Sequence, residues 1–125
     1  MPKTVLMIDD SASSLLMNRI VITQKTGHEV VTAVSGQEGL KLAATSKPDL
    51  ILLDVMMPGM DGLEVCRRLR TRIETVKTPI VLLTYRSGDD IVRRGFESGC
   101  DAYLNKPLED AKLVETVNKY LGSTK

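Results

Sequence analysis

Short segments that are wholly apolar alternate along this chain with longer segments whose apolar residues recur at helical spacing. Residues 5–8, 50–53 and 80–83 are apolar at every position, which is typical of strands covered on both faces. Such strands form parallel sheets, in which a helix crosses one face of the sheet between successive strands. The alternation therefore predicts a doubly wound, three-layer α/β fold, and the length of 125 residues predicts a single domain, residues 1–125.

Glycine, proline and hydroxyl-bearing residues between the apolar segments place the remaining elements. We expect two further strands, over residues 29–34 and 102–104. Helices are expected over about residues 11–25, 36–46, 63–73 and 87–98, and a last one carries residues 113–121. The helix over 63–73 is inferred from four residues on one stripe: Leu63, Cys66, Leu69 and Ile73. Residues 121–125 are either a true terminus or the start of a missing linker.

Composition and charge exclude several classes of protein. The formal net charge is +1, whereas nucleic-acid-binding domains carry a strong basic excess, so no direct nucleic-acid binding is expected. No apolar run reaches the roughly 20 residues of a membrane span, and Cys66 and Cys100 lack a metal-binding spacing. We therefore expect a cytoplasmic protein with two buried thiols. One arginine cluster is interpreted as a solvated helix face, with a binding role as the alternative: Arg67, Arg68, Arg70 and Arg72.

Two single residues allow more than one interpretation. His28 is the sole histidine and is interpreted as an ordinary surface or strand-start residue. Gly95 lies inside the expected fourth helix, where glycine costs about 1 kcal/mol relative to alanine. We expect Gly95 either to soften that helix or to permit close packing.

Charged or reactive residues follow four of the five expected strands. Asp9 and Asp10 follow the first strand and Asp54 closes the third. Thr84 ends the fourth strand, and Lys106 comes just after the fifth. Because ligands of open parallel α/β sheets bind at the carboxyl ends of the strands, we expect these five side chains to form one site.

The residue types at this edge indicate the chemistry. Three carboxylates outnumber the single ammonium group of Lys106, and like charges held close together are unfavourable unless they are neutralised. Ligation by oxygen alone favours Mg²⁺, with Mn²⁺ as an alternative. A carboxylate can act as the nucleophile that forms an aspartyl phosphate, and Thr84 and Lys106 are suited to binding the remaining phosphoryl oxygens.

Four parts of the sequence resemble the receiver domain of bacterial two-component response regulators, the chemotaxis-Y-like phosphoacceptors. They are Ile8-Asp9-Asp10, residues 53–62 with Asp54 at their start, Thr84, and residues 103–107 with Lys106-Pro107. The resemblance extends over essentially the whole chain. It implies a flavodoxin-like (βα)5 fold with a five-stranded sheet in the order 2-1-3-4-5, and a cis peptide bond between Lys106 and Pro107.

The resemblance also implies roles at the acidic edge. Asp54 would accept a phosphoryl group from the phosphohistidine of a sensor histidine kinase or a histidine phosphotransfer protein. Asp10, Asp54 and the backbone carbonyl of Met56 would bind Mg²⁺, and Asp9 would hold a metal-bound water. Lys106 would contact Asp54 or the phosphoryl group. Such a domain is a phosphoacceptor in a phosphorelay rather than a classical enzyme, with self-catalysed phosphorylation and dephosphorylation at most.

Signal output is implied by the same resemblance. Thr84 would move toward the phosphoryl oxygens and Tyr103 would turn inward as Thr84 vacates space. The surface formed by the fourth helix, fifth strand and last helix would then bind a downstream protein or output domain. Met56, Tyr85 and Arg86 occupy positions that tune the phosphoryl lifetime in this family. Tyr85 stands where a small residue is usual, and we expect it either to slow phosphorylation by small donors and hydrolysis or to point outward.

Three other functions are weighed against this one. A receiver fold could act as an interaction module independently of phosphorylation. A phosphatase of the haloacid dehalogenase type uses similar residues, but it takes its nucleophile from a D-x-D motif after the first strand, where this chain has adjacent aspartates. A flavodoxin-like protein could bind a flavin phosphate near residues 11–14, although Asp9 and Asp10 would repel that phosphate and the chain has no Trp.

Overall fold

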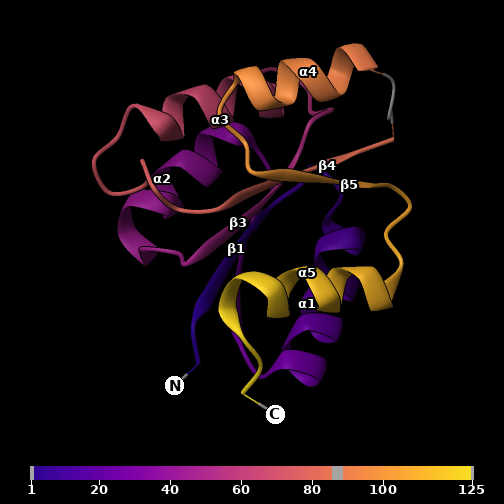
Figure 1. Cartoon of the computed structure of the whole chain (residues 1–125). Coiled ribbons are helices and arrows are strands. Elements are labelled where there is room, and N and C mark those ends of the chain that lie inside the picture. Colours follow the sequence, from indigo (N-terminus) through magenta and orange to yellow (C-terminus); the bar gives the residue numbers. More distant parts are fainter. Residues whose placement is uncertain (1, 86–88, 125) are drawn as a thin grey trace.

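The computed structural model describes residues 2–85 and 89–124. Within these residues, five strands alternate with five helices (Figure 1). In chain order they are β1 (Thr4–Ile8), α1 (Ala12–Thr26), β2 (Glu29–Ala33), α2 (Gly36–Ser46), β3 (Leu50–Asp54), α3 (Gly62–Arg70), β4 (Ile80–Thr84), α4 (Asp89–Glu97), β5 (Ala102–Asn105) and α5 (Asp110–Leu121). None of the described helices is long and apolar enough to cross a membrane.

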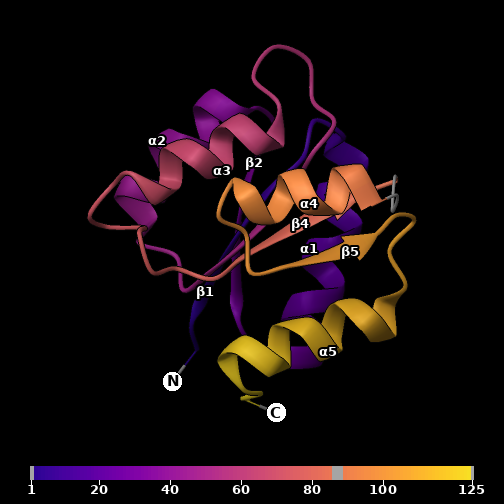
Figure 2. The ribbon, with the colours of Figure 1, turned by 45° about the horizontal axis from the view of Figure 1, so that its top comes forward.

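The strands form one sheet in the order β2-β1-β3-β4-β5, and every neighbouring pair is parallel. Helices α2, α3 and α4 cover one face of the sheet, and α1 and α5 cover the other (Figures 1 and 2). This arrangement confirms the predicted three-layer α/β fold and the strand order expected from the resemblance.

The core explains why three strands are apolar throughout. Along β1, Leu6 and Ile8 pack in the cluster under α2 and α3, whereas Val5 and Met7 pack in the cluster that includes residues of α1 and α5. Successive side chains of a strand point to opposite faces, so a strand with helices on both faces needs an apolar residue at each position. Every residue of β3 and β4 is buried, as the sequence pattern predicts.

Helix starts are fixed by side chains at the edge where the strands end. Ser11, Ser35 and Asp61 cap α1, α2 and α3, each accepting a hydrogen bond from a backbone N–H three residues later. Such caps satisfy donors that have no partner within the helix. Gly27, with φ of 80°, ends α1 in the left-handed conformation that glycine adopts readily.

Helix α3 is shorter than the sequence pattern predicts. It ends at Arg70, and Ile73, which we expected on its buried stripe, is 91% exposed in the loop that follows. The buried hydroxyl of Thr75 donates to the carbonyl of Leu69, and Arg70 donates to the carbonyls of Thr75 and Thr78. These bonds turn the chain back under the helix end, so the apolar spacing does not continue as helix.

The arginine cluster is engaged by the protein itself. Arg67 and Arg68 both pair with Glu64 on the solvated side of α3, as the first interpretation proposed. Arg70 is largely buried and its guanidinium reaches four acceptors, including Asp101 and the carbonyl of Gly99. Arg72 donates to the carbonyl of Leu40.

His28 immediately precedes β2, but it is 1% exposed rather than a surface residue. Its Nδ1 accepts a hydrogen bond from the backbone N–H of Lys3. Its Nε2 therefore carries the proton and donates to the carbonyl of Gly122. The imidazole thus joins the start of β1, the start of β2 and the segment after α5, which no sequence periodicity reveals.

Candidate phosphoacceptor site

The predicted site residues meet at the carboxyl ends of the strands. Asp9 and Asp10 follow β1, Asp54 is the last residue of β3 and Thr84 the last residue of β4. Lys106 follows β5, and its backbone N–H donates to the carbonyl of Thr84 at 2.8 Å. The parallel register places all four strand ends at one edge of the sheet.

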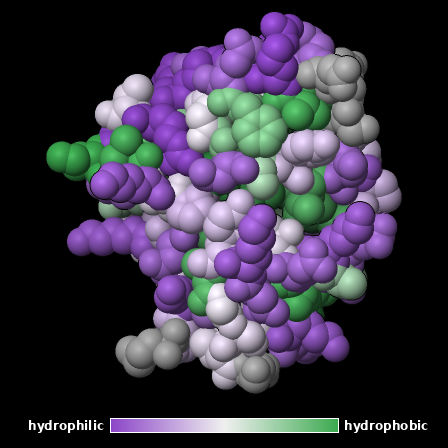
Figure 3. Space-filling model, viewed as in Figure 1, coloured by the Kyte–Doolittle hydropathy of each residue, from purple (hydrophilic) through white to green (hydrophobic). Residues whose placement is uncertain are grey.

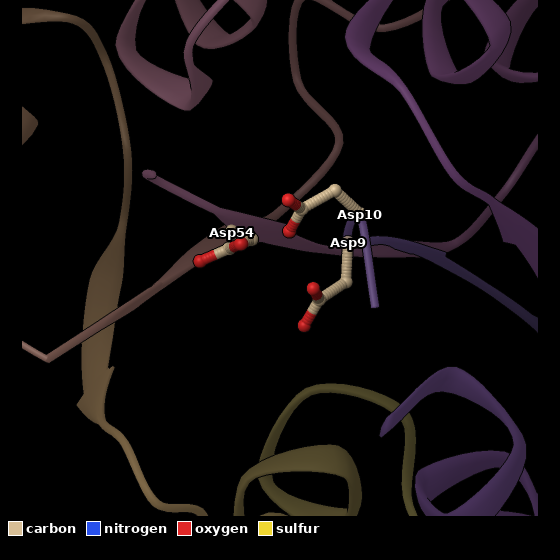
Figure 4. A group of neighbouring side chains, drawn as sticks. All are labelled: Asp9, Asp10 and Asp54. Carbon is tan, nitrogen blue, oxygen red and sulfur yellow. The ribbon is translucent and has the colours of Figure 1, made fainter. Parts of the chain in front are cut away.

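The three aspartates lie close to one another at this edge of the sheet (Figure 4). One carboxylate oxygen from each of Asp9, Asp10 and Asp54 lies within 4.8 Å of the others. Asp9 and Asp54 are only 1% and 3% exposed, whereas Asp10 is exposed. Asp9 is held in place by the backbone N–H of Ser11, which donates to its Oδ1 at 3.0 Å.

Lys106 bridges the two buried carboxylates. Its Nζ lies 2.8 Å from Oδ2 of Asp9 and 3.3 Å from Oδ1 of Asp54. The sequence pointed to Asp54 as the partner of Lys106, and the shorter ion pair with Asp9 was not predicted. The peptide bond between Lys106 and Pro107 is cis.

Burial and charge shift the pKa values of Asp54 and Lys106. Burial, followed by the charge of Asp9, raises the pKa of Asp54 to about 6, although Lys106 acts in the opposite direction. Burial alone would lower the pKa of Lys106, but the hydrogen bond from Lys106 to Asp9 and the charges of both carboxylates raise it overall. Three carboxylates thus lie beside a single ammonium group at this site.

The donor set fits a hard divalent cation. Its ligand atoms are oxygens, and a cation would offset the excess of carboxylate charge at the position where the three side chains converge. Within the described part of the chain, one group of three or more acidic, His or Cys side chains has its ligand atoms close enough to share a metal ion. It consists of these three aspartates.

Thr84 and Tyr103 lie on the side of the site that faces α4. Thr84 is buried, and both residues line a small hollow of about 10 Å³ beneath α4. The half-buried Tyr103 ring packs edge-on against Phe96, with ring centroids 6.5 Å apart.

Of the three predicted tuning residues, two are described and both are exposed. Met56 lies in the loop after β3. Tyr85 is 67% exposed, yet its ring lies near Lys106, whose Nζ is 5.4 Å from the ring centroid. Together with Lys106 and residues of α1, Tyr85 lines a groove of about 270 Å³ that the sequence did not reveal. Arg86 lies outside the described residues.

Comparisons with known proteins agree with this geometry. A family model described as the response regulator receiver domain matches residues 5–118. The transcriptional regulatory protein AfsQ1 of Streptomyces coelicolor is 49% identical over 97% of this chain and 52% of its own length. The polar-differentiation response regulator DivK of Brucella anthropi is 34% identical over 98% of both chains. The structure of the Vibrio cholerae chemotaxis protein CheY4 has a TM-score of 0.92 and 32% identity, covering 97% of this chain and all of its own.

The chain spans about half the length of AfsQ1, whose name describes a whole transcriptional regulator, but nearly all of DivK and CheY4. The matches favour neither the phosphatase nor the phosphorylation-independent alternative. Receiver domains are regulatory phosphoacceptors of two-component signalling rather than classical enzymes. Sequence and structure together establish that this chain belongs to the response regulator receiver domain family.

Proposed function

We propose that Asp54 accepts a phosphoryl group from the phosphohistidine of a sensor histidine kinase or a histidine phosphotransfer protein. One observation carries this proposal: Asp54 ends a wholly buried strand beside Asp9 and Asp10, with Lys106 between two of the three carboxylates. In this proposal Asp54 is the nucleophile, the neighbouring carboxylates bind a cation and Lys106 supplies a fixed positive charge; these groups lie within a few ångströms of one another.

The transfer exchanges one bond to phosphorus for another. A carboxylate oxygen of Asp54 attacks the phosphorus, a P–O bond forms, and the P–N bond to the donor histidine breaks. The electron pair of that bond returns to the imidazole nitrogen. Hydrolysis later replaces the bond to Asp54 by a bond to a water oxygen and releases inorganic phosphate. Because little covalent chemistry falls to the protein, positioning and charge neutralisation dominate catalysis.

Asp10, Asp54 and the backbone carbonyl of Met56 are the groups proposed to hold Mg²⁺, and Asp9 would hold one of its waters. Mn²⁺ has the same preference for oxygen ligands. The cation supplies charge compensation between the carboxylates and the incoming phosphoryl oxygens. Asp9 acts in addition through Lys106, which it holds at 2.8 Å.

Lys106 and Thr84 are proposed to bind the transferred phosphoryl group. Lys106 already contacts both Asp9 and Asp54. A small movement of its Nζ would bring it to an oxygen of a phosphoryl group attached to Asp54. Thr84 lies at the end of the neighbouring strand and its hydroxyl can donate to a second oxygen. These new hydrogen bonds exist only in the phosphorylated state, so they can shift a two-state equilibrium.

We propose that the surface formed by α4, β5 and α5 transmits the phosphorylation signal to a partner. Thr84 and Tyr103 border α4 from below, and the exposed Phe96 lies against Tyr103. Figure 3 shows hydrophobic residues gathered between α4 and β5 on this face. We propose that a downstream protein or output domain binds there, in the cytoplasm and with no direct contact between this domain and nucleic acid.

Incubation with acetyl phosphate and Mg²⁺ tests the proposal. Mass spectrometry should detect one added phosphoryl group that is labile to base, and Asp54→Asn should abolish it. Asp61→Asn is the matched control, because Asp61 lies in the following loop and Asn caps a helix as well as Asp does; it should still be labelled. Absence of an adduct with this donor and with a phosphohistidine donor would favour a phosphorylation-independent module, and sustained hydrolysis of a phosphate ester would favour a phosphatase.

A further inference from the structure

The hollow beneath α4 is bordered by both residues of the proposed switch. Thr84 borders it from β4 and Tyr103 from β5, and Gly95 borders it from the helix above. Its volume of about 10 Å³ is at the lower limit of what a single water molecule needs. The side chains that phosphorylation is proposed to move therefore share one very small space.

Gly95 is one of the residues that border this space, and it adds no side chain to it. It is buried within α4, and a Cβ at this position would lie 2.9 Å from Cδ1 of Leu82 and 3.6 Å from Sγ of Cys100. The first distance is too short for a normal contact between carbon atoms. Glycine costs about 1 kcal/mol relative to alanine inside a helix. At Gly95 this loss of helix stability is offset by the close packing of α4 on β4, which a side chain would prevent. Gly95 also leaves a small space that no side chain fills.

We propose that Gly95 is a positioning residue for the switch, because its missing side chain leaves room for Tyr103 to turn inward when Thr84 moves toward the phosphoryl group. This inference rests on the proposed function. Thr84 and Tyr103 border the same hollow, so the ring would enter it together with the space that Thr84 vacates. A methyl group added at Gly95 would press on Leu82, which borders the same hollow, and would reduce that margin.

Gly95→Ala tests the inference in protein labelled with 3-fluorotyrosine. The ¹⁹F resonance of Tyr103, assigned with Tyr103→Phe, is recorded before and after phosphorylation by acetyl phosphate with Mg²⁺, and the adduct is quantified by mass. We expect Gly95→Ala to form the adduct to the parent's extent but to lose more than half of the Tyr103 shift. Arg94→Ala is the control, because Arg94 is the exposed neighbour of Gly95 on the same helix, and it should respond like the parent.

A second variant tests the steric cause. Leu82→Val removes the Cδ1 atom that the added methyl group would meet, so combining it with Gly95→Ala should restore most of the Tyr103 shift. A full shift in Gly95→Ala alone, or no restoration in the double variant, overturns the inference. An adduct on the parent without any movement of Tyr103 overturns the inference and leaves the phosphoacceptor intact. No adduct on the parent overturns both, and the mass measurement distinguishes these cases.

Discussion

At Asp54, burial and neighbouring charge work against the ionised form that phosphoryl transfer needs. Burial and Asp9 raise the pKa of Asp54 from 3.8 to about 6, and Lys106 offsets only part of this effect. The folded protein therefore binds this proton more tightly than the unfolded chain does. In the absence of divalent cations, the stability contributed by a protonated Asp54 is present below about pH 4 and is lost as the pH rises to about 6.

Asp54→Asn should therefore stabilise the cation-free protein at neutral pH. We expect a gain in the free energy of unfolding of about 3 kcal/mol at pH 7.5, because the pKa of Asp54 rises from 3.8 to about 6 and each pKa unit corresponds to roughly 1.4 kcal/mol; little change is expected near pH 4. Lys106 keeps its ion pair with Asp9 in this variant. Urea unfolding with a chelator present, at several pH values, measures the difference. Asp61→Asn serves as the control and should change stability little; a destabilised Asp54→Asn protein at pH 7.5 would contradict the argument.

Tyr85 directly follows Thr84 in the chain, and its ring lies beside Lys106. Replacement by alanine removes the ring from the groove that it lines and should open the approach to Asp54. We expect several-fold faster labelling by acetyl phosphate and several-fold faster loss of the phosphoryl group, measured by stopped-flow and by release of inorganic phosphate. Tyr85→Phe keeps the ring over Lys106 and should match the parent. Equal rates in all three proteins would show that Tyr85 only covers surface.

At the scale of the elements, the loop between α3 and β4 is organised by a single side chain. Arg70 donates to the carbonyls of Gly99, Thr75 and Thr78 and to the carboxylate of Asp101. Asp101 in turn accepts from the backbone N–H of Ile80 at the start of β4. The planar guanidinium thus joins the end of α3, its following loop and the turn before β5.

Arg70→Lys should destabilise the fold although it keeps the charge. An ammonium group cannot reach four acceptors in fixed directions, and each buried carbonyl left without a donor costs about 1–3 kcal/mol. We expect a loss of about 2–4 kcal/mol in the free energy of unfolding, measured with urea. Arg67→Lys is the matched control, since Arg67 makes only an exposed pair with Glu64, and it should change stability by less than about 0.5 kcal/mol. Equal effects of the two substitutions would refute this role for Arg70.

At the scale of the whole molecule, the sequence alone predicted the layered α/β architecture. It also predicted which side chains lie together at the carboxyl ends of the strands. Strands buried on both faces are apolar throughout, so β1, β3 and β4 could be predicted from their sequences alone. Because parallel strands end at the same edge, the residues that follow them had to lie near one another. Strand order came from the family resemblance, since local pattern does not decide which strands pair.

The features that the sequence did not reveal depend on contacts between distant segments. Lys106 pairs most closely with Asp9, 97 residues away. The burial of His28 depends on partners at Lys3 and Gly122, and the exposure of Ile73 follows from bonds made by Arg70 and Thr75. Periodicity describes one segment at a time, so it carries no information about such partners.

The imidazole of His28 also determines how a mechanical load would pass through the molecule. It links the backbone at Lys3 to the backbone at Gly122, and Thr124 is bonded to the end of α1 through Thr26. Tension applied along the chain beyond Gly122 would therefore be shared between α5, to which Gly122 is covalently joined, and the amino ends of β1 and β2. The share carried by His28 would enter the sheet at the amino ends of the strands, the edge opposite Asp54.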